Sequence, residues 1–215
     1  MFFSNTPRQE SLQALADVKL MPFWLDDKNK PEKTQPLTTK IESDLTIIGA
    51  GFTGLWTALL AKQQNPNLEV IIIEANEVAY GASGRNGGFC SASLTHGFLN
   101  GISRWEKEFP KLLQLGRNNL DEIENTIKQY HIECDFIRSG EINVAVEPYQ
   151  IDDILEEVEL SKHYGVNAKF LSQDEIRAHV NSPSYLAAIF DPDMAILNPA
   201  QLAWGLRRIC LGLGV

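Results

Sequence analysis

The chain has 215 residues, of which 44% are hydrophobic, and its formal net charge at pH 7 is −9. This length corresponds to one large domain or a domain and a half, and the apolar fraction is sufficient for a core. The negative charge argues against binding to nucleic acid or to an anionic membrane surface. The three cysteines are widely spaced, which indicates a reducing compartment and no disulfide framework.

The N-terminus lacks a basic region followed by an apolar stretch, so we expect no signal peptide. No apolar run approaches the roughly 18 residues of a membrane-spanning helix, so we expect no membrane span. These features together predict a cytoplasmic protein. They leave its oligomeric state open.

Residues 1–42 precede the first expected strand and are predicted to form an N-terminal arm. Residues 11–20 have weak helical character, and an apolar island at 21–25 precedes a polar segment. We expect Phe23 and Trp24 to pin this arm to the globular part. The alternative is an arm that binds a partner or exchanges between the subunits of a dimer.

Residues 43–74 have the order strand, glycine turn, helix, strand, acid. An apolar run at 45–48 leads into the turn Gly-Ala-Gly-Phe-Thr-Gly at 49–54, and a helical segment follows to about residue 64. A second apolar run at 68–73 ends at Glu74. This order is typical of the dinucleotide-binding βαβ unit.

The three glycines and the acid of this unit each have a physical role. Gly49 permits the tight turn, Gly51 lets the backbone approach a pyrophosphate, and Gly54 lets the helix pack close to the strand. The helix N-terminus faces the negative charge of the phosphates. Glu74 follows Gly54 by 20 residues, where its carboxylate can accept hydrogen bonds from ribose hydroxyls. A glycine-rich turn in another kind of α/β protein is the alternative interpretation.

A second glycine-rich segment, YGASGRNGG, spans residues 80–88. Its backbone is nearly free of side chains, so it can lie against a flat ring system and donate amide N–H groups to it. With GAGFTG and the acid after the second strand, GASGRNGG resembles the FAD-dependent amine and amino-acid oxidoreductases of the D-amino-acid oxidase type, in the branch that contains γ-glutamylputrescine oxidase. The likeness spans about residues 40 to 215, the N-terminal half of a usual family member.

This resemblance implies an α/β fold and FAD rather than NAD as the cofactor. The fold is expected to have a Rossmann-like FAD-binding βαβ domain and the start of an α+β substrate domain, truncated. The candidate cofactor-binding residues are Gly49, Ala50, Gly51, Phe52, Thr53, Gly54, Glu74, Ala75, Ser83, Gly84, Arg85, Asn86, Gly87 and Gly88. The resemblance implies that residues 83–88 lie near the pyrophosphate and the flavin.

Three side chains within or shortly after this segment are candidates for a role at the cofactor or the substrate. Arg85 could neutralise phosphate or stabilise negative charge on a reduced flavin, or it could be a surface arginine that orders the loop. His96 is a candidate active-site base or orienting group, with a hydrogen-bonded structural histidine as the alternative. Cys90 is expected to be a small buried residue. No metal-ligand spacing and no Ser/His/Asp constellation is present in the sequence, so we expect no metal site.

Helices and strands alternate over the rest of the chain. A helix is expected over 110–130, with an apolar stripe formed by Leu113, Leu120, Ile123, Ile127 and Tyr130. Strands are expected at 132–137, 141–146, 166–171 and 186–190. Further helices are expected at 149–164 and at 199–211, the latter after the N-cap Asn198. A short helix is also expected to begin at a capping box formed by Ser172 and Glu175. Arg207 and Arg208 are expected on the solvated face of the last helix.

We divide the chain into an N-terminal arm (1–42), the first part of the FAD-binding domain (43–137), the first part of the substrate domain (138–190) and a return helix toward the FAD domain (191–215) that is cut short. Residues 140–145 resemble the family strand that enters the substrate domain. In the resembled family a strand and a further long region follow residue 215, so we interpret the chain as an N-terminal fragment.

The resemblance implies a FAD-dependent oxidoreductase that oxidises the C–N bond of a small-molecule amine or amino acid by hydride transfer to the flavin. The fragment alone is expected to be inactive. The alternatives are a non-catalytic flavin- or nucleotide-binding fragment and an NAD-dependent reductase that uses the same βαβ unit. The substrate, the choice between oxidase and dehydrogenase, and covalent attachment of FAD stay open.

Overall fold

The computed structural model describes residues 6–19 and 21–215. Residues 1–5, in which no leader sequence is expected, and Leu20, the expected end of the first helix, lie outside this description. The helices are α1 (Gln9–Ala14), α2 (Phe52–Gln64), α3 (Phe98–Trp105), α4 (Phe109–Gln129), α5 (Tyr149–His163), α6 (Gln173–His179) and α7 (Pro199–Gly212). The strands are β1 (Leu45–Ile48), β2 (Val70–Ile73), β3 (Phe89–Ser91), β4 (Glu141–Ala145), β5 (Lys169–Ser172), β6 (Ala187–Asp191) and β7 (Met194–Ile196).

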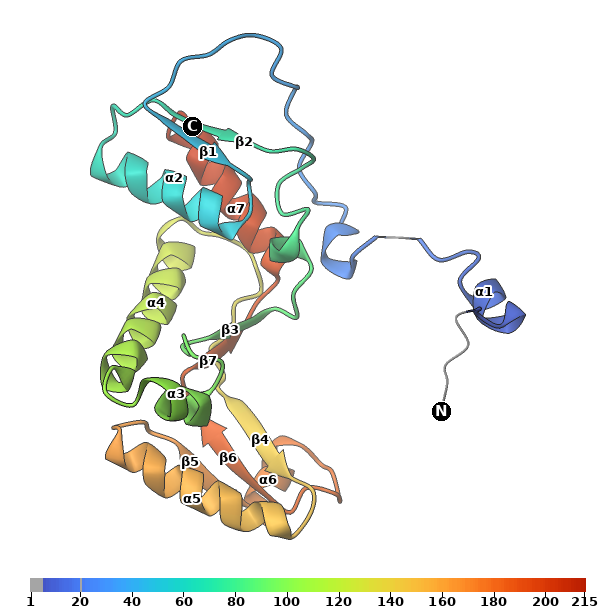
Figure 1. Cartoon of the computed structure of the whole chain (residues 1–215), viewed down its shortest axis with the longest axis vertical. Coiled ribbons are helices and arrows are strands. Elements are labelled where there is room, and N and C mark those ends of the chain that lie inside the picture. Colours follow the sequence, from blue (N-terminus) through green and yellow to red (C-terminus); the bar gives the residue numbers. More distant parts are fainter. Residues whose placement is uncertain (1–5, 20) are drawn as a thin grey trace.

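These elements form three parts that follow one another along the longest axis of the molecule (Figure 1). One end holds β1, β2, α2 and α7, the middle holds β3, β7, α3 and α4, and the other end holds β4, β5, β6, α5 and α6. The N-terminal arm leaves this body to one side. Of the helices in the described ranges, none is both long enough and apolar enough to cross a bilayer.

The first part is the βαβ unit that the sequence predicts. β1 and β2 pair in parallel, from Leu45 opposite Val70 to Ile48 opposite Ile73. Helix α7, from the far end of the sequence, packs against α2, and their buried side chains share one core cluster with Val70 of β2. Parallel strands need such helical cover because both faces of their sheet are apolar.

The middle part is an antiparallel ribbon covered by a helix. Phe89 of β3 lies opposite Ile196 of β7, and Leu120 of α4 is fully buried against this ribbon. The expected strand over 132–137 is wrong, because only Ile137 pairs, in a single bridge with Ile196. His131 and Asp135 have φ of 49° and 52°, and these left-handed residues interrupt the extended backbone that a strand requires.

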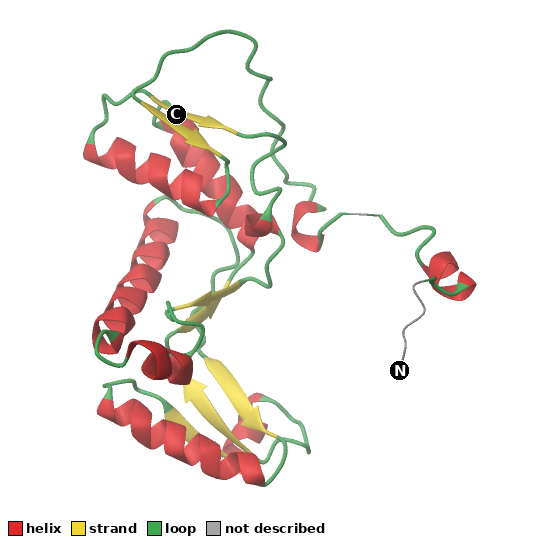
Figure 2. Ribbon diagram, viewed as in Figure 1, coloured by secondary structure: helices red, strands yellow, loops and turns green. Residues whose placement is uncertain are grey.

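The third part is an antiparallel sheet of three strands, in the order β4-β6-β5, with α5 packed on it (Figure 2). Ser172 and Glu175 form the predicted capping box at the start of α6, with both reciprocal hydrogen bonds present. The fold class is therefore confirmed as a Rossmann-like βαβ unit followed by an antiparallel α+β part.

The boundaries of the long helices agree with the sequence predictions to within one residue for α4, α5 and α7. Asn198 caps α7 as predicted, by accepting a hydrogen bond from the backbone N–H of Gln201. By contrast, α2 begins at Phe52, inside the glycine turn, and β2 and β5 begin two or three residues later than predicted. The short elements α3, β3 and β7 were not predicted, because three to eight residues carry too little periodicity.

The N-terminal arm contacts the body at several points between Trp24 and Lys33. Helix α1 buries no residue and stands apart from the body in Figure 1. Trp24 packs against the main core, as predicted, and Leu25 is only 1% exposed. Phe23 does not pin the arm, because its side chain is 81% exposed and contacts the Trp24 ring edge-on.

Candidate cofactor site

The turn between β1 and α2 has the geometry of a phosphate-binding turn. Gly49 has φ of +97°, which a residue with a side chain adopts only under strain. A Cβ atom at Gly54 would collide with the carbonyl oxygen of Gly49, so only glycine lets α2 approach the strand end this closely. The first turn of α2 thus presents backbone N–H groups that have no intrahelical partner. Such a helix N-terminus attracts anions.

The glycine loop, which we define as residues 81–88, meets this same helix N-terminus. The backbone N–H of Phe52 donates a hydrogen bond to Ser83 Oγ at 2.9 Å. A Cβ atom at Gly51 would lie 2.9 Å from the same oxygen, so Gly51 leaves room for the serine. The fold therefore brings together the two segments on which the sequence interpretation depends.

Glu74 lies at the carboxyl end of β2 and faces a pocket. Its two carboxylate oxygens accept backbone N–H groups, one from Ala50 at 2.8 Å and one from Asn76 at 2.9 Å. A carboxylate offers about four lone-pair positions, so two of them are free for further donors. The carboxylate is thus fixed in orientation and can still accept hydroxyl groups from a ligand.

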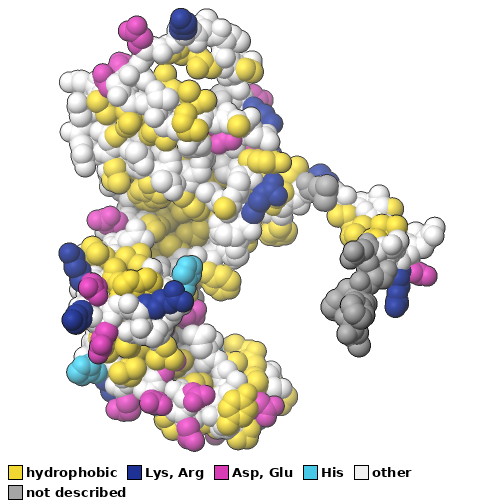
Figure 3. All heavy atoms as spheres, in the orientation of Figure 1, with side chains coloured by type: hydrophobic (Ala, Val, Ile, Leu, Met, Phe, Trp, Pro, Cys, Tyr) yellow, Lys and Arg dark blue, Asp and Glu magenta, His cyan; other side chains and the backbone are white. Residues whose placement is uncertain are grey.

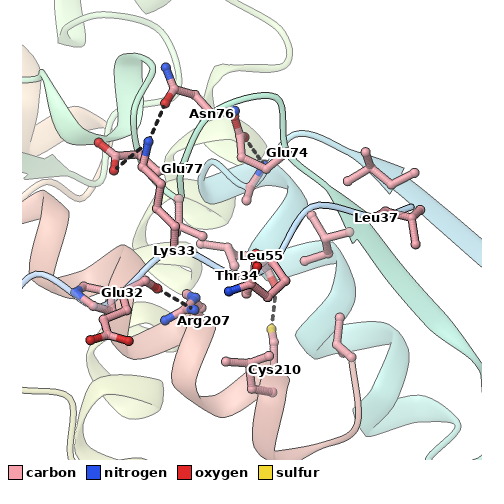
Figure 4. Close-up of a pocket in the computed structure, with 18 of the residues that line it drawn as sticks. Glu32, Lys33, Thr34, Leu37, Leu55, Glu74, Asn76, Glu77, Arg207 and Cys210 are labelled. Carbon is pink, nitrogen blue, oxygen red and sulfur yellow. Dashed lines mark hydrogen bonds and ion pairs between the residues drawn. The ribbon is translucent and has the colours of Figure 1, made fainter. Parts of the chain in front are cut away.

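The pocket at Glu74 has a volume of about 470 Å³, within the range of small-molecule sites. Its walls come from residues 30–37 of the arm, from β2 with the turn after it, and from α7 (Figure 4). Lys33 reaches across to Asn76 at 3.2 Å and to Glu77 at 3.8 Å. Leu55 and Cys210 give the floor an apolar character. A cavity with an apolar floor, and with the oriented Glu74 carboxylate in its wall beside the glycine turn, fits the adenosine half of a dinucleotide.

The glycine loop is ordered by its own side chains. Asn86 donates through Nδ2 to the carbonyl oxygens of Ala82 and Ser83 and accepts the N–H of Gly88 at 2.9 Å. Arg85 donates to the carbonyl oxygen of Tyr80 at 2.6 Å, and its guanidinium lies 4.7 Å from the centre of the Tyr80 ring. This arrangement supports the second role considered for Arg85, an exposed residue that orders the loop.

The two glycines at the end of the loop differ in their surroundings. Gly88 is buried, has φ of +80°, and has no room for a Cβ atom beside the carbonyl oxygen of Leu197. Gly87 is exposed, and a Cβ atom there would meet only the ring of Phe89 at 3.1 Å. Gly88 is therefore required by the fold, whereas Gly87 leaves the loop surface open.

His96 and Cys90 follow the loop but differ in exposure. His96 is exposed at φ of 54°, and within the described residues its imidazole makes no hydrogen bond, so the hydrogen-bonded structural role is wrong. Burial raises the pKa of the Cys90 thiol, although the charge of Arg138 opposes this shift. A protonated, half-buried thiol agrees with the packing role predicted for Cys90. Across residues 6–19 and 21–215, no group of three His, Cys, Asp or Glu side chains could hold a metal ion.

Sequence reasoning missed most of the pocket walls. Lys33, Asn76 and Glu77 line the pocket beside Glu74. Asn76 and Glu77 could have been found from the sequence, because they follow Glu74 by two and three residues. Arg207 also lines the pocket and donates to the carbonyl oxygen of Glu32 at 3.1 Å. Arg208 donates to the carbonyl oxygen of Tyr130 at 3.0 Å. Arg208 is exposed, as expected for the solvated face of the last helix, whereas Arg207 is half-buried in the pocket wall, so the expectation is wrong for Arg207 only.

Comparisons with known proteins agree with this geometry. A family model described as FAD dependent oxidoreductase matches residues 44–215. A probable oxidoreductase, OrdL, of Haemophilus influenzae is 32% identical over 200 residues, which cover 90% of this chain and 45% of the relative. Gamma-glutamylputrescine oxidoreductase of Escherichia coli is 30% identical over 189 residues, which cover 85% of this chain and 43% of the relative. The chain spans less than half the length of these curated relatives.

Solved structures share the fold at low sequence identity. Glycine oxidase from Bacillus cereus matches with a TM-score of 0.63 and 18% identity, over 80% of this chain and 45% of that chain. L-amino acid deaminase from Proteus myxofaciens matches with a TM-score of 0.66 and 22% identity, over 86% of this chain and 39% of that chain.

Proposed function

Since the chain belongs to the family of FAD-dependent oxidoreductases, we propose that the whole protein oxidises the C–N bond of a small amine or amino acid. FAD is the cofactor of this family. The names of the relatives support the substrate class, because they include gamma-glutamylputrescine oxidoreductase, glycine oxidase and L-amino acid deaminase. When bound, FAD supplies the redox chemistry, as it accepts a hydride from the carbon that carries the nitrogen.

The observation that carries the proposal is the junction of Ser83 with the N-terminus of α2. This contact fixes the glycine loop beside the phosphate-binding turn, so one ligand can span the pocket at Glu74, the helix N-terminus and the loop. In the proposed site Glu74 accepts ribose hydroxyls, the first-turn amides of α2 face the pyrophosphate, and the exposed Gly87 lies toward the flavin. His96 stays a candidate for a proton-transfer or orienting group on the substrate side.

The unpaired cysteines support a cytoplasmic location for the proposed enzyme, since Cys90, Cys134 and Cys210 form no disulfide. The division of the chain at residues 42, 137 and 190 is likewise a proposal. It is supported by the separate core cluster that Ala145, Ile154, Val158 and Ile189 form within residues 138–190.

The test uses the full-length protein that contains this chain. Its cofactor is released by denaturation and identified by chromatography, and the holoprotein is then mixed anaerobically with amines and with D- and L-amino acids. The expected result is one FAD per chain and bleaching of the flavin absorption by at least one substrate. Binding of NAD without flavin would contradict the proposal in favour of a nicotinamide-dependent reductase. Bound flavin that no amine or amino acid reduces would favour a non-catalytic flavin-binding protein.

A further inference from the structure

The arm touches the glycine loop directly, although more than 50 residues of sequence separate them. Trp24 Nε1 donates a hydrogen bond to the carbonyl oxygen of Asn86 at 2.8 Å. A Cβ atom at Gly84 would lie 2.8 Å from Leu25 Cδ2, and one at Gly88 would lie 3.6 Å from Trp24 Cζ2. The indole and the leucine therefore cover both ends of the segment 84–88.

This contact is built into the fold. Leu25 is 1% exposed and belongs to the same core cluster as α2 and α7. Farther along the arm, Lys30 forms an ion pair with Glu77 at 2.7 Å, and the Glu77 side chain is only 11% exposed. Gln201 of α7 donates to Asp27 at 3.2 Å. The arm is thus attached at two places, to the glycine loop through Trp24 and to the pocket wall through Lys30.

The glycine loop needs outside support because glycine loses more conformational freedom on ordering than any other residue. The hydrogen bonds of Asn86 and Arg85 are local and tie the loop mainly to itself. Contacts with the rest of the fold come from Ser83, from the pairing of Gly88 with Leu197, and from the arm. Helix α7 also packs against residues 82–84. Among the described residues, the contact that joins the backbone of Asn86 to a distant segment is the hydrogen bond from Trp24.

We infer that Trp24 and Leu25 are positioning residues for FAD, which hold the backbone of residues 84–88 in its cofactor-binding conformation. The inference rests on the proposed function, because it assumes that the loop binds FAD. It assigns the arm to the cofactor site and not to a partner or to a second copy of the chain.

The test compares three variants of the full-length protein, each prepared without cofactor. Trp24→Phe removes the indole N–H and keeps an aromatic ring, Leu25→Ala opens a void beneath Gly84, and Leu15→Ala makes the same truncation at a side chain that is 65% exposed. The Kd for FAD is measured by titration. Trypsin cleavage after the exposed Arg85 is followed in the protein without FAD, as a measure of loop order. Thermal unfolding reports on the rest of the fold.

A net contribution of about 0.5–1.5 kcal/mol for one hydrogen bond predicts a Kd raised roughly two- to tenfold in Trp24→Phe. Cleavage after Arg85 should be faster by a similar factor, with the melting temperature near that of the wild type, and Leu15→Ala should match the wild type throughout. If Leu25→Ala fails to fold, Trp24→Phe alone decides the result. An unchanged Kd in Trp24→Phe would overturn the inference, whatever the cleavage rate. A wild-type protein that binds no FAD would instead overturn the proposed function.

Discussion

Glu74 has two roles in the structure, one in fixing the backbone and one in lining the pocket. Its carboxylate holds the glycine turn through Ala50 and the following turn through Asn76, and it also faces the pocket. Hydrogen bonds to charged groups are worth about 1.5–3 kcal/mol each, more than neutral ones. The residue therefore shapes the site before it contacts any ligand.

For this reason, Glu74→Ala should weaken FAD binding by about ten- to a hundredfold in the full-length protein. Equilibrium titration of the protein without cofactor measures this change. The matched control is Glu69→Ala, which removes an exposed glutamate at the other end of the same strand region and should leave the Kd unchanged. An unchanged Kd in Glu74→Ala would remove this carboxylate from the cofactor site.

Gly87→Val should leave the protein folded and strongly reduce its flavin content. Position 87 is exposed, and a Cβ atom there meets only the exposed ring of Phe89, so the protein without FAD has little reason to unfold. Gly88→Ala is the opposite case, because its Cβ atom collides with the backbone of Leu197 and destabilises the fold itself. Flavin absorbance per chain and thermal unfolding separate the two outcomes. Full flavin occupancy in Gly87→Val would mean that the loop faces away from the cofactor.

The thiols of Cys134 and Cys210 should be nearly unreactive in the folded protein. Burial raises the pKa of each to about 11, so the thiolate that reacts with disulfide reagents is about one part in a thousand at pH 8. Raising the pH should speed labelling, by about tenfold per unit below that pKa. Labelling with a thiol reagent, followed by peptide mass spectrometry, should show Cys90 first and the other two only after denaturant is added. Equal rates for all three in the native state would contradict the buried positions.

At the scale of the elements, α2 can approach β1 closely because Gly54 has no side chain. A Cβ atom at Gly54 would meet the backbone of Gly49 and the side chain of Ile47. Neither a backbone oxygen nor a strand residue can move without disturbing the parallel pair of β1 and β2. The close approach of helix and strand therefore depends on this one residue.

Gly54→Ala should lower the free energy of unfolding by at least roughly 1–3 kcal/mol, the usual cost of overpacking. Gly212→Ala is the matched control, since it lies in the last turn of α7 with open space around it. Alanine there should be neutral or stabilise by up to about 1 kcal/mol. Denaturant titration of both variants gives the comparison. A Gly54→Ala variant as stable as the wild type would show that α2 can shift away from β1.

The sequence predicted those elements whose patterns are local. The βαβ unit, the helix α4 and the capping box at Ser172 all depend on residues within a few turns of one another, and they were found. The strand over 132–137 failed because the left-handed residues His131 and Asp135 override its apolar character. The pocket wall from the arm could not be predicted, since Lys33 reaches Asn76 only after the chain has crossed the surface of α7.

At the scale of the whole molecule, a row of apolar side chains lies open on the middle part. Phe89 of β3, Ile196 of β7 and Ile137 are cross-strand neighbours in that order and share one face. These three residues are 73%, 44% and 55% exposed. Figure 3 shows hydrophobic side chains gathered across the middle of the molecule. Contiguous apolar surface of this kind usually meets another surface.

The 215-residue chain expressed alone should therefore self-associate, retain FAD weakly and turn over no amine. Light scattering of the purified chain and an assay with amines and D-amino acids, read by peroxide and by artificial electron acceptors, test these three points. Phe89→Ser should reduce the association, whereas Tyr149→Ser, at a side chain 70% exposed on α5, should not. A monomeric chain whose flavin is rapidly reduced by any substrate would contradict this prediction.

The packing of α7 against α2 has a consequence for biosynthesis. The backbone carbonyl oxygen of Leu55 accepts a hydrogen bond from the Cys210 thiol. The core of the nucleotide-binding unit is therefore completed by residues that lie 155 positions apart in the sequence. Translation adds about 5–20 residues per second, so α2 leaves the ribosome many seconds before the helix that covers it. During this interval its apolar face is exposed to other nascent chains. Chaperone engagement should accordingly be strongest while residues 65–199 are being synthesised and should fall once α7 emerges.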